Sequence, residues 1–230
     1  MRTCMLAFWV MVISAPFAFA EGSKAPTDKT IDAIDGVKII VKAQGPYDAD
    51  VPLQVVCFFK HKAGGDTTRG AAVELDKRLK GAISSLRNSG EFVGDELETI
   101  LLTPPAGAIK PKHLLIIGLG KESDLSLETM ERIGRVALRS GADLGIDRIA
   151  FAPLLRDQGN DTLAVGNVET AVIRGMLKAY ITERKLQKNG FSSEFALKEW
   201  IVEAGPVFFN DTVTGVEKGI EEAKASLKSP

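Results

Sequence analysis

Two glycine-rich segments of this sequence could bring backbone amides close to an anion. The first is Gly118-Leu119-Gly120, which follows the apolar run 113–117. Glycines at the carboxyl end of a buried strand let amides approach a phosphate. The second is segment 64–70, where an arginine could pair with the anion. The sequence therefore predicts a small anionic ligand near Gly64, Gly65, Arg69, Gly70, Gly118 and Gly120.

Both segments also fit a purely structural role. A dinucleotide-binding loop needs a third glycine and immediate helix entry, whereas the polar residues 121–124 intervene here. A phosphate-binding P-loop is excluded because Lys121 is not followed by Ser or Thr. In the second segment, Thr67 or Thr68 could cap a helix within an ordinary loop. A tight turn and a capped loop therefore remain the alternatives to an anion site.

The sequence predicts no catalytic or metal-binding set. His61 and His113 each stand beside a lysine, and neither has a second histidine or a carboxylate at metal-ligand spacing. A serine triad would need a histidine base and a nucleophile-elbow pattern, which no serine here has. Cys57 lies within the apolar run 55–59, where a free cysteine behaves as a buried hydrophobe. We therefore expect no catalytic residue, no metal ion and no cofactor.

The first twenty residues have the three parts of a secretory signal peptide. Arg2 supplies the positive charge, residues 6–13 the apolar core, and Ala18-Phe19-Ala20 the small-residue cleavage site. The apolar stretch is shorter than the roughly 20 residues that a bilayer span needs. We therefore expect cleavage after residue 20, a secreted or periplasmic protein, and no membrane span in the remainder.

The charges are balanced, with 29 Lys and Arg against 30 Asp and Glu. General nucleic-acid binding usually shows as a basic face, so this balance argues against it. The partners left open are a small anionic ligand, a protein, or a second copy of the chain.

Alternating hydrophobic patterns predict an α/β domain. Strands are expected at 37–43, 51–59, 98–103, 112–118, 147–153 and 195–204. Helices are expected at 67–90, 127–140, 168–179 and 213–227, with a charged turn at 183–190. Ser126 is the predicted N-cap of the second helix, and the small residues Ala171 and Gly175 would let the third lie close to the sheet. The order of elements predicts a three-layer α/β/α fold with a mixed, largely parallel sheet.

Segment 75–186 resembles the amino-terminal domain of the leucine aminopeptidase family, the M17 peptidases. The matching stretches are 75–83, 92–94, 113–121, 125–128 and 175–186. The resemblance implies a macro-domain-like fold and a domain that is not itself catalytic. The family's metal ions and catalytic lysine and arginine belong to a carboxyl-terminal domain, whose signature Asn-Thr-Asp-Ala-Glu-Gly-Arg-Leu does not occur in this sequence. No catalytic residue is therefore carried over.

These observations divide the sequence into four expected parts. They are the signal peptide 1–20, a flexible leader 21–30, the family-like domain 31–190, and a last strand and helix, 191–230, that resemble the family's interdomain connection. Three functions remain open. The chain is expected to be a non-catalytic binding or assembly module, a macro-like pocket for a nucleotide or phosphate-bearing ligand, or a separately encoded regulatory partner of an aminopeptidase.

Overall fold

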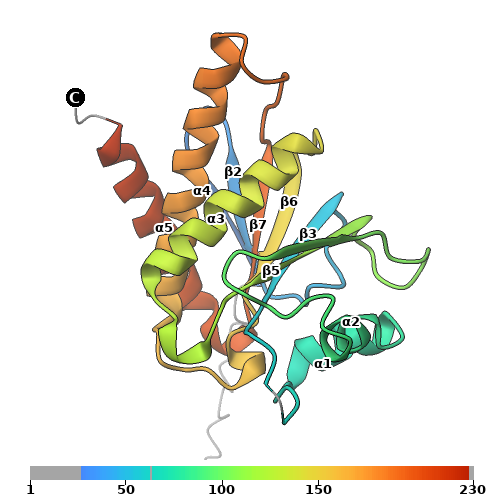
Figure 1. Cartoon of the computed structure of the whole chain (residues 1–230). Coiled ribbons are helices and arrows are strands. Elements are labelled where there is room, and N and C mark those ends of the chain that lie inside the picture. Colours follow the sequence, from blue (N-terminus) through green and yellow to red (C-terminus); the bar gives the residue numbers. More distant parts are fainter. Residues whose placement is uncertain (1–26, 63, 228–230) are drawn as a thin grey trace, which may run out of the picture.

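The computed structural model describes residues 27–62 and 64–227, and its centre is a seven-stranded sheet (Figure 1). The strands are β1 (Asp28–Asp32), β2 (Lys38–Lys42), β3 (Leu53–Phe58), β4 (Thr99–Leu102), β5 (His113–Gly118), β6 (Arg148–Ala152) and β7 (Glu199–Glu203). Their order across the sheet is β1-β2-β7-β6-β3-β5-β4. The five inner strands are parallel, and β1 and β4 pair antiparallel at the edges. The predicted mixed, largely parallel sheet is confirmed.

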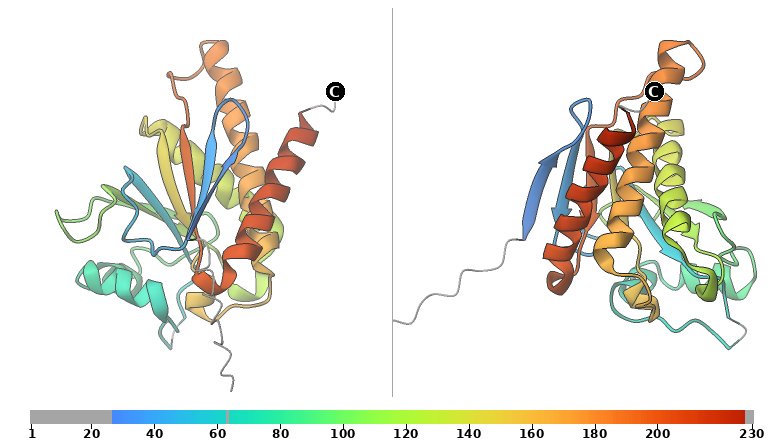
Figure 2. Two further views of the ribbon diagram at one scale, coloured as in Figure 1. Left: turned by 180° about the vertical axis from the view of Figure 1, so that it is seen from behind. Right: turned by 90° about the vertical axis from the view of Figure 1, so that its left-hand side faces the viewer.

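Helices cover both faces of the sheet. They are α1 (Gly70–Arg78), α2 (Ala82–Asn88), α3 (Leu127–Asp143), α4 (Val165–Lys188) and α5 (Phe209–Ser226), with short 3-10 helices η1 (Glu122–Asp124), η2 (Arg156–Gln158) and η3 (Pro206–Phe208). Figure 2 shows α3, α4 and α5 side by side on one face, while α1 and α2 lie on the other. The three-layer α/β/α arrangement predicted from the sequence is therefore present.

The hydrophobic core lies on both sides of the sheet. All six residues of β3 are buried, which accounts for its nearly continuous apolar sequence. On the side of α3–α5, Phe151 and Trp200 of neighbouring strands stack with ring centroids 5.9 Å apart. On the opposite side, Leu75 and Ile83 from α1 and α2 pack with the buried residues of β3 and β5. Burial on both faces fixes the sheet as the rigid support for the loops at its ends.

The single helix predicted at 67–90 is in fact two helices. The chain turns at Lys80 and Gly81, whose φ angles of 56° and 79° lie in the left-handed region. The Asp76 carboxylate then accepts hydrogen bonds from the Ile83 and Ser84 amides, at 2.9 and 3.2 Å, at the start of α2. Apolar spacing continues across the break because both helices face the same layer of the core.

Helices α3 and α4 are longer than predicted. Ser126 does cap α3, since its hydroxyl accepts from the Thr129 amide at 3.1 Å, but the helix runs past Gly141 to Asp143. Likewise α4 continues through the charged residues 183–188, which were expected to form a turn. Charged residues suit an exposed helical turn as well as a loop, and the left-handed Gly190 follows the helix end.

Glycines set the spacing between helices more than that between helix and sheet. A side chain at Gly175 of α4 would collide with the backbone carbonyl of Glu131 in α3. The expectation that Gly175 allows close approach to the sheet was therefore wrong, because its open side faces α3.

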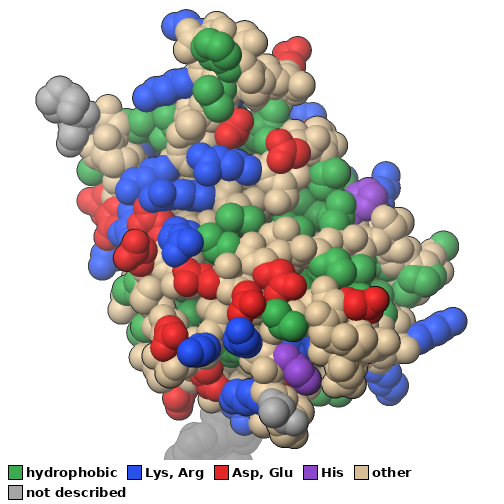
Figure 3. Space-filling model, in the orientation of Figure 1, with side chains coloured by type: hydrophobic (Ala, Val, Ile, Leu, Met, Phe, Trp, Pro, Cys, Tyr) green, Lys and Arg blue, Asp and Glu red, His purple; other side chains and the backbone are tan. Residues whose placement is uncertain are grey.

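Charged side chains of both signs interleave over α3, α4 and α5 (Figure 3). Glu131 is central to this surface, accepting from Arg174 Nε at 2.9 Å and from Lys178 Nζ at 3.2 Å, with Arg135 also paired to it. Its side chain is mostly buried between these cations. The surface is therefore a network of ion pairs across adjacent helices.

Segments near both ends of the described chain contribute a strand to the sheet, although the chain itself ends with α5. Asp28, within the segment expected to be a leader, pairs with Lys42 as part of β1. Strand β7, from segment 191–230, lies between β2 and β6. The predicted signal peptide and residues 21–26 lie outside the described residues. None of the described helices is long and apolar enough to cross a membrane.

Candidate functional site

The turn from Gly118 to Gly120 is packed inside the protein. All three of its amides donate to backbone carbonyl oxygens, at 2.7 to 3.0 Å; the acceptors are Glu98, Phe58 and Gly94. A side chain at Gly118 would run into the backbone of Gly94 and Asp95. Glycine is required because another segment crosses the turn so closely. The amides of this turn are therefore hydrogen-bonded within the protein and are not available to bind an anion.

The predicted anion loop 64–70 ends against η2. The Arg69 amide donates to the carbonyl oxygen of Asp157 at 2.8 Å, and its Nε donates to that of Arg156 at 3.1 Å. Gly70 has a φ of 56°, and a side chain there would meet the Asp157 carboxylate. A side chain added at Gly64 or Gly65 would meet no atom within 4 Å, and the Gly65 amide donates to the Lys62 carbonyl oxygen at 2.8 Å. Arg69 and Gly70 therefore contact the 156–157 segment, whereas those two glycines do not.

Loop 64–70 approaches Glu122, which follows the glycine turn, but little space is left between them. A void of about 10 Å³ lies between Lys60, Lys62, Thr67 and Glu122, close to the volume that a single water needs. Gln158 fills the carboxyl end of β3: it accepts from the Phe59 amide at 2.8 Å and donates to the Cys57 and Leu154 carbonyl oxygens at 3.0 and 3.1 Å. A phosphate group would not fit there unless Gln158 moved.

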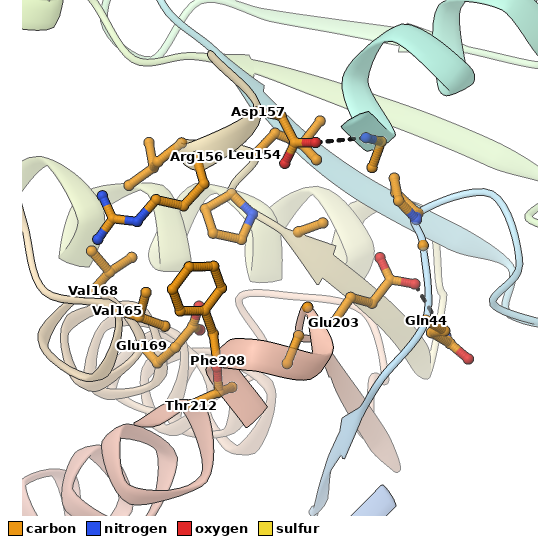
Figure 4. Close-up of a pocket in the computed structure, with 18 of the residues that line it drawn as sticks. Gln44, Leu154, Arg156, Asp157, Val165, Val168, Glu169, Glu203, Phe208 and Thr212 are labelled. Atoms are coloured by element: carbon orange, nitrogen blue, oxygen red, sulfur yellow. Dashed lines mark hydrogen bonds between the residues drawn. The ribbon is translucent and has the colours of Figure 1, made fainter. Parts of the chain in front are cut away.

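A larger cavity opens farther along the same sheet edge, at the carboxyl ends of β2, β6 and β7 (Figure 4). We call it the carboxyl-edge cavity, and its volume is about 220 Å³. Parallel α/β sheets typically bind ligands at this edge. Its apolar walls come from the loop after β6, from the first turns of α4, and from η3; they include Leu154, Val165, Val168 and Phe208.

Glu203, the last residue of β7, lies in this cavity with both carboxylate oxygens hydrogen-bonded. Its Oε2 accepts from Gln54 Nε2 at 2.7 Å and its Oε1 from Gln44 Nε2 at 3.0 Å. Burial raises the pKa of Glu203 to about 8, although both amide donors act in the opposite direction. Glu203 is therefore mostly protonated at neutral pH.

Glu169, in the second turn of α4, is the more unusual carboxyl of the cavity. The residue is only 2% exposed, and its Oε2 has no hydrogen-bond partner among the described residues. Burial raises the pKa of Glu169 to about 8. Cys57 lies near enough for the Glu169 charge to add to the effect of burial in raising the pKa of the thiol. A buried carboxyl without a partner is costly for stability. Because Glu169 lines the cavity, it is a candidate for contact with a ligand there.

The one guanidinium among the described lining residues is engaged elsewhere. Arg156 donates from its terminal nitrogens to the carbonyl oxygens of Asn160 at 2.6 Å and Leu163 at 2.7 Å. Its guanidinium carbon lies 5.9 Å from the centroid of the Phe208 ring. The neighbouring Asp157 accepts from the Ala71 amide at 2.6 Å, yet burial raises its pKa. The lining is therefore richer in carboxyl groups than in cations.

This arrangement suits a ligand with an apolar body and a hydrogen-bond donor or positive charge. The three carboxyl groups Asp157, Glu169 and Glu203 disfavour a phosphate inside the cavity. In the part of the chain that the structure describes, no three His, Cys, Asp or Glu side chains gather as a metal ion would require.

Neither buried glutamate was singled out from the sequence, although a signal for both exists. Glu169 follows Val168 on the apolar stripe of α4, and Glu203 ends the apolar run 200–202 of β7. A glutamate that continues an apolar stripe points to a buried charged group. Glycine turns at strand ends are common features of binding sites, so the sequence pattern favours the glycine segments instead.

Comparison with known sequences places residues 55–188 in the amino-terminal domain of the cytosol aminopeptidase family. The probable cytosol aminopeptidase of Persephonella marina is 29% identical over 149 residues, which are 64% of this chain and 28% of that protein. The one from Roseiflexus castenholzii is 30% identical over 99 residues, 43% of this chain and 20% of that protein. The matches thus span less than a third of either relative's length.

Known structures agree with the fold. A tomato leucine aminopeptidase mutant superposes with a TM-score of 0.57 at 18% identity, over 86% of this chain and 37% of that one. The Oceanobacillus iheyensis macrodomain with ADP gives a TM-score of 0.53 at 10% identity, over 86% of this chain and 97% of that one. At these identities the likeness concerns the fold alone. Because the family match covers more than half of the sequence, the chain belongs to the cytosol aminopeptidase family, through that family's amino-terminal domain.

Proposed function

We propose that this chain is a non-catalytic binding module that holds one small ligand in the carboxyl-edge cavity. The observation that carries the proposal is Glu169, a buried carboxyl that lines the cavity without a hydrogen-bond partner for Oε2 among the described residues. A ligand bound against this carboxyl would offset the cost of burying it without a partner. The family match supports the non-catalytic part, because residues 55–188 correspond to the amino-terminal domain.

The module acts outside the cytoplasm in this proposal. The support is the sequence of the first twenty residues, with its charged start, apolar core and small-residue cleavage site. Fractionation of cells that produce the whole chain, followed by mass determination of the mature protein, tests it. Recovery of the uncleaved chain in the cytoplasm would contradict it.

A fragment screen tests the binding function. Amide NMR spectra of the whole chain are recorded with small fragments of positive, negative and zero charge. We expect some of them to bind, to lose binding in a cavity-filling Val168→Phe variant, and to keep it in Val73→Phe. Val168 is 3% exposed and lines the cavity, whereas Val73 is 45% exposed on α1. The binding function is wrong if no fragment of any charge is displaced by filling the cavity.

The absence of catalysis is tested directly. Purified chain is incubated with aminoacyl p-nitroanilides and manganese or zinc, and we expect no turnover above the metal alone. A two-metal peptidase needs several ligands converging on one place. Release of p-nitroaniline that increases with protein concentration would make the chain an enzyme.

A nucleotide is the alternative ligand, because the Oceanobacillus iheyensis macrodomain of similar fold is described with ADP. The hydrogen-bonded amides of turn 118–120 and the acidic lining of the cavity favour the first proposal over this one. Calorimetric titration with ADP-ribose decides the matter, and we expect no heat of binding at millimolar concentration.

A protein partner from the same family is the second candidate function. Family membership supports it, as does the exposure of two large apolar side chains, Phe191 at 80% and Val207 at 88%. Purification of tagged chain from its own cells, with mass spectrometry of what accompanies it, tests this role. Retention of an aminopeptidase by the wild type but not by a Phe191→Ser, Val207→Ser variant is the expected result, and equal retention by both would count against it.

A further inference from the structure

We infer that the ligand of the carboxyl-edge cavity carries a protonated primary amine on a short apolar body, and that Glu169 binds the ammonium group. This inference rests on the proposed binding function, since it specifies the ligand of the same cavity. It follows from three observations: an unpartnered carboxyl, the sign and partners of the neighbouring charged groups, and the size and lining of the cavity.

The first observation is the state of Glu169. The residue is 2% exposed and lines the cavity, and its Oε2 accepts no hydrogen bond from any described residue. An ammonium group supplies both a positive charge and three donors, which are what a buried carboxylate lacks. Burial without a cation is also the reason that the pKa of Glu169 is raised to about 8. An anionic ligand would increase that cost instead of removing it.

The second observation is the sign and the partners of the neighbouring charged groups. The Arg156 guanidinium donates to the Asn160 and Leu163 carbonyl oxygens and forms no ion pair with Glu169 among the described residues. Glu203 and Asp157 already accept hydrogen bonds from donors of the protein itself, and neither lining residue supplies a positive charge to Glu169. Glu169 is therefore the carboxyl that remains available to bind a cation directly.

The third observation is the size and lining of the cavity. A cavity of about 220 Å³ accommodates only a small molecule. Pockets for drug-sized ligands are larger, at roughly 300–1,000 Å³. Leu154, Val165, Val168 and Phe208 provide apolar contact for a hydrocarbon body of this size.

Isoamylamine and isoamyl alcohol form the test pair, since they share one apolar body and differ in the charged group. Each is titrated into the whole chain at pH 7 and followed by amide NMR. We expect the amine to bind at least about tenfold more tightly than the alcohol, as a charge-assisted hydrogen bond would give. We also expect Glu169→Gln to remove this preference. Glu128→Gln, at an exposed position on α3, is the matched control and should preserve it.

The protonated amine could belong to the amino terminus of a peptide or to a small free amine. A peptide with leucine at a free amino terminus distinguishes these two sources. Binding of that peptide, but not of its acetylated form, would support the inference with a peptide terminus as the source. Binding of isoamylamine alone would support it with a small free amine.

Equal binding of amine and alcohol by the wild type would overturn the inference, and so would an amine preference that survives in Glu169→Gln. The wild-type comparison needs no variant, so a Glu169→Gln protein that fails to fold leaves the test intact. Fragments that bind without preferring an amine would refute this inference and leave the binding function standing. Failure of every fragment would refute the binding function itself.

Discussion

Gln54 and Glu203 are hydrogen-bonded across an intervening strand: Gln54 Nε2 on β3 donates to Glu203 Oε2 on β7 over 2.7 Å, with β6 between them. Gln54 is fully buried and Glu203 is 8% exposed. The side-chain oxygen of Gln54 has no partner within the described residues. The carboxyl is therefore held at the cavity by an amide that is itself only half satisfied.

Replacing Gln54 with leucine tests how far the burial of Glu203 depends on the Gln54 amide. The variant Gln54→Leu leaves Glu203 with Gln44 as its donor, and we expect a loss of about 1–3 kcal/mol in the free energy of unfolding. The loss should be larger at pH 9 than at pH 5, because the ionised carboxylate needs its donors more. Urea unfolding at both pH values measures it. Gln187→Leu, in the last turn of α4, is the control: its side chain is half-buried and accepts a solvent-exposed hydrogen bond from Arg184 at 2.9 Å, so the change in stability should be less than about 0.5 kcal/mol.

Stability of the wild-type chain should fall as the pH rises from about 5 to 8. The pKa values of Glu169 and Glu203 are raised to about 8 in the folded chain, above the unfolded value of 4.5. Below pH 4.5 both states are protonated and burial costs nothing further. Above it the unfolded state loses its protons first, so unfolding is favoured until the folded carboxyls also ionise.

Glu169→Gln should flatten part of this slope. At pH 8 the variant should be more stable than the wild type by an amount on the order of a few kcal/mol, because a neutral amide replaces a carboxyl that resists ionisation. Thermal unfolding between pH 5 and 9 checks it, with Glu128→Gln as the control. A wild-type slope that Glu169→Gln leaves unchanged would show that Glu169 does not produce it.

Glu131 should show the opposite dependence on pH. Burial alone would raise its pKa, but hydrogen bonds from Arg135, Arg174 and Lys178 outweigh burial and hold the pKa at about 2. Its contribution to stability is present above pH 4.5 and is lost as the pH falls toward 2. We expect Glu131→Gln to destabilise the chain by about 1–3 kcal/mol at pH 7 and by less at pH 3. Urea titrations at the two pH values decide it, and equal losses would contradict the assignment.

Gly175→Ala should separate α3 from α4. The added methyl group would collide with the Glu131 carbonyl, which belongs to a helix backbone and cannot rotate away. Overpacking of this kind costs about 1–3 kcal/mol, which calorimetric melting would detect. Gly64→Ala is the control because nothing lies within 4 Å of the added carbon. A melting temperature unchanged by Gly175→Ala would refute this close packing.

Local sequence was sufficient to predict most of the fold. Strand β3 could be located because all six residues are buried, which leaves a continuous apolar run. The break between α1 and α2 could not, because the apolar spacing continues across it and the turn depends on the backbone at Lys80 and Gly81. Strand β1 was missed because four of its five residues are exposed, so it has no apolar run.

The site was harder to predict because it depends on contacts between distant segments. Gln158 fills the end of β3 by bonding to Phe59, about a hundred residues earlier, and no local pattern marks that role. Gly118 was correctly placed at a strand end, but its closeness to Gly94 and Asp95 follows from a separate loop. Glu169 gave a usable local signal, as an acid within an apolar stripe.

The place of β7 in the sheet has a consequence for the order of folding. Strands β1 and β2 join the rest of the sheet through β7 alone, and Ile40 of β2 pairs with Ile201 across 161 positions of sequence. An emerging chain can thus complete β3, β5 and β6 while β1 and β2 still wait for a neighbour. The sheet can therefore be completed only after residues 199–203 are available to form β7. Until then the hairpin of β1 and β2 has no strand of the sheet with which to pair.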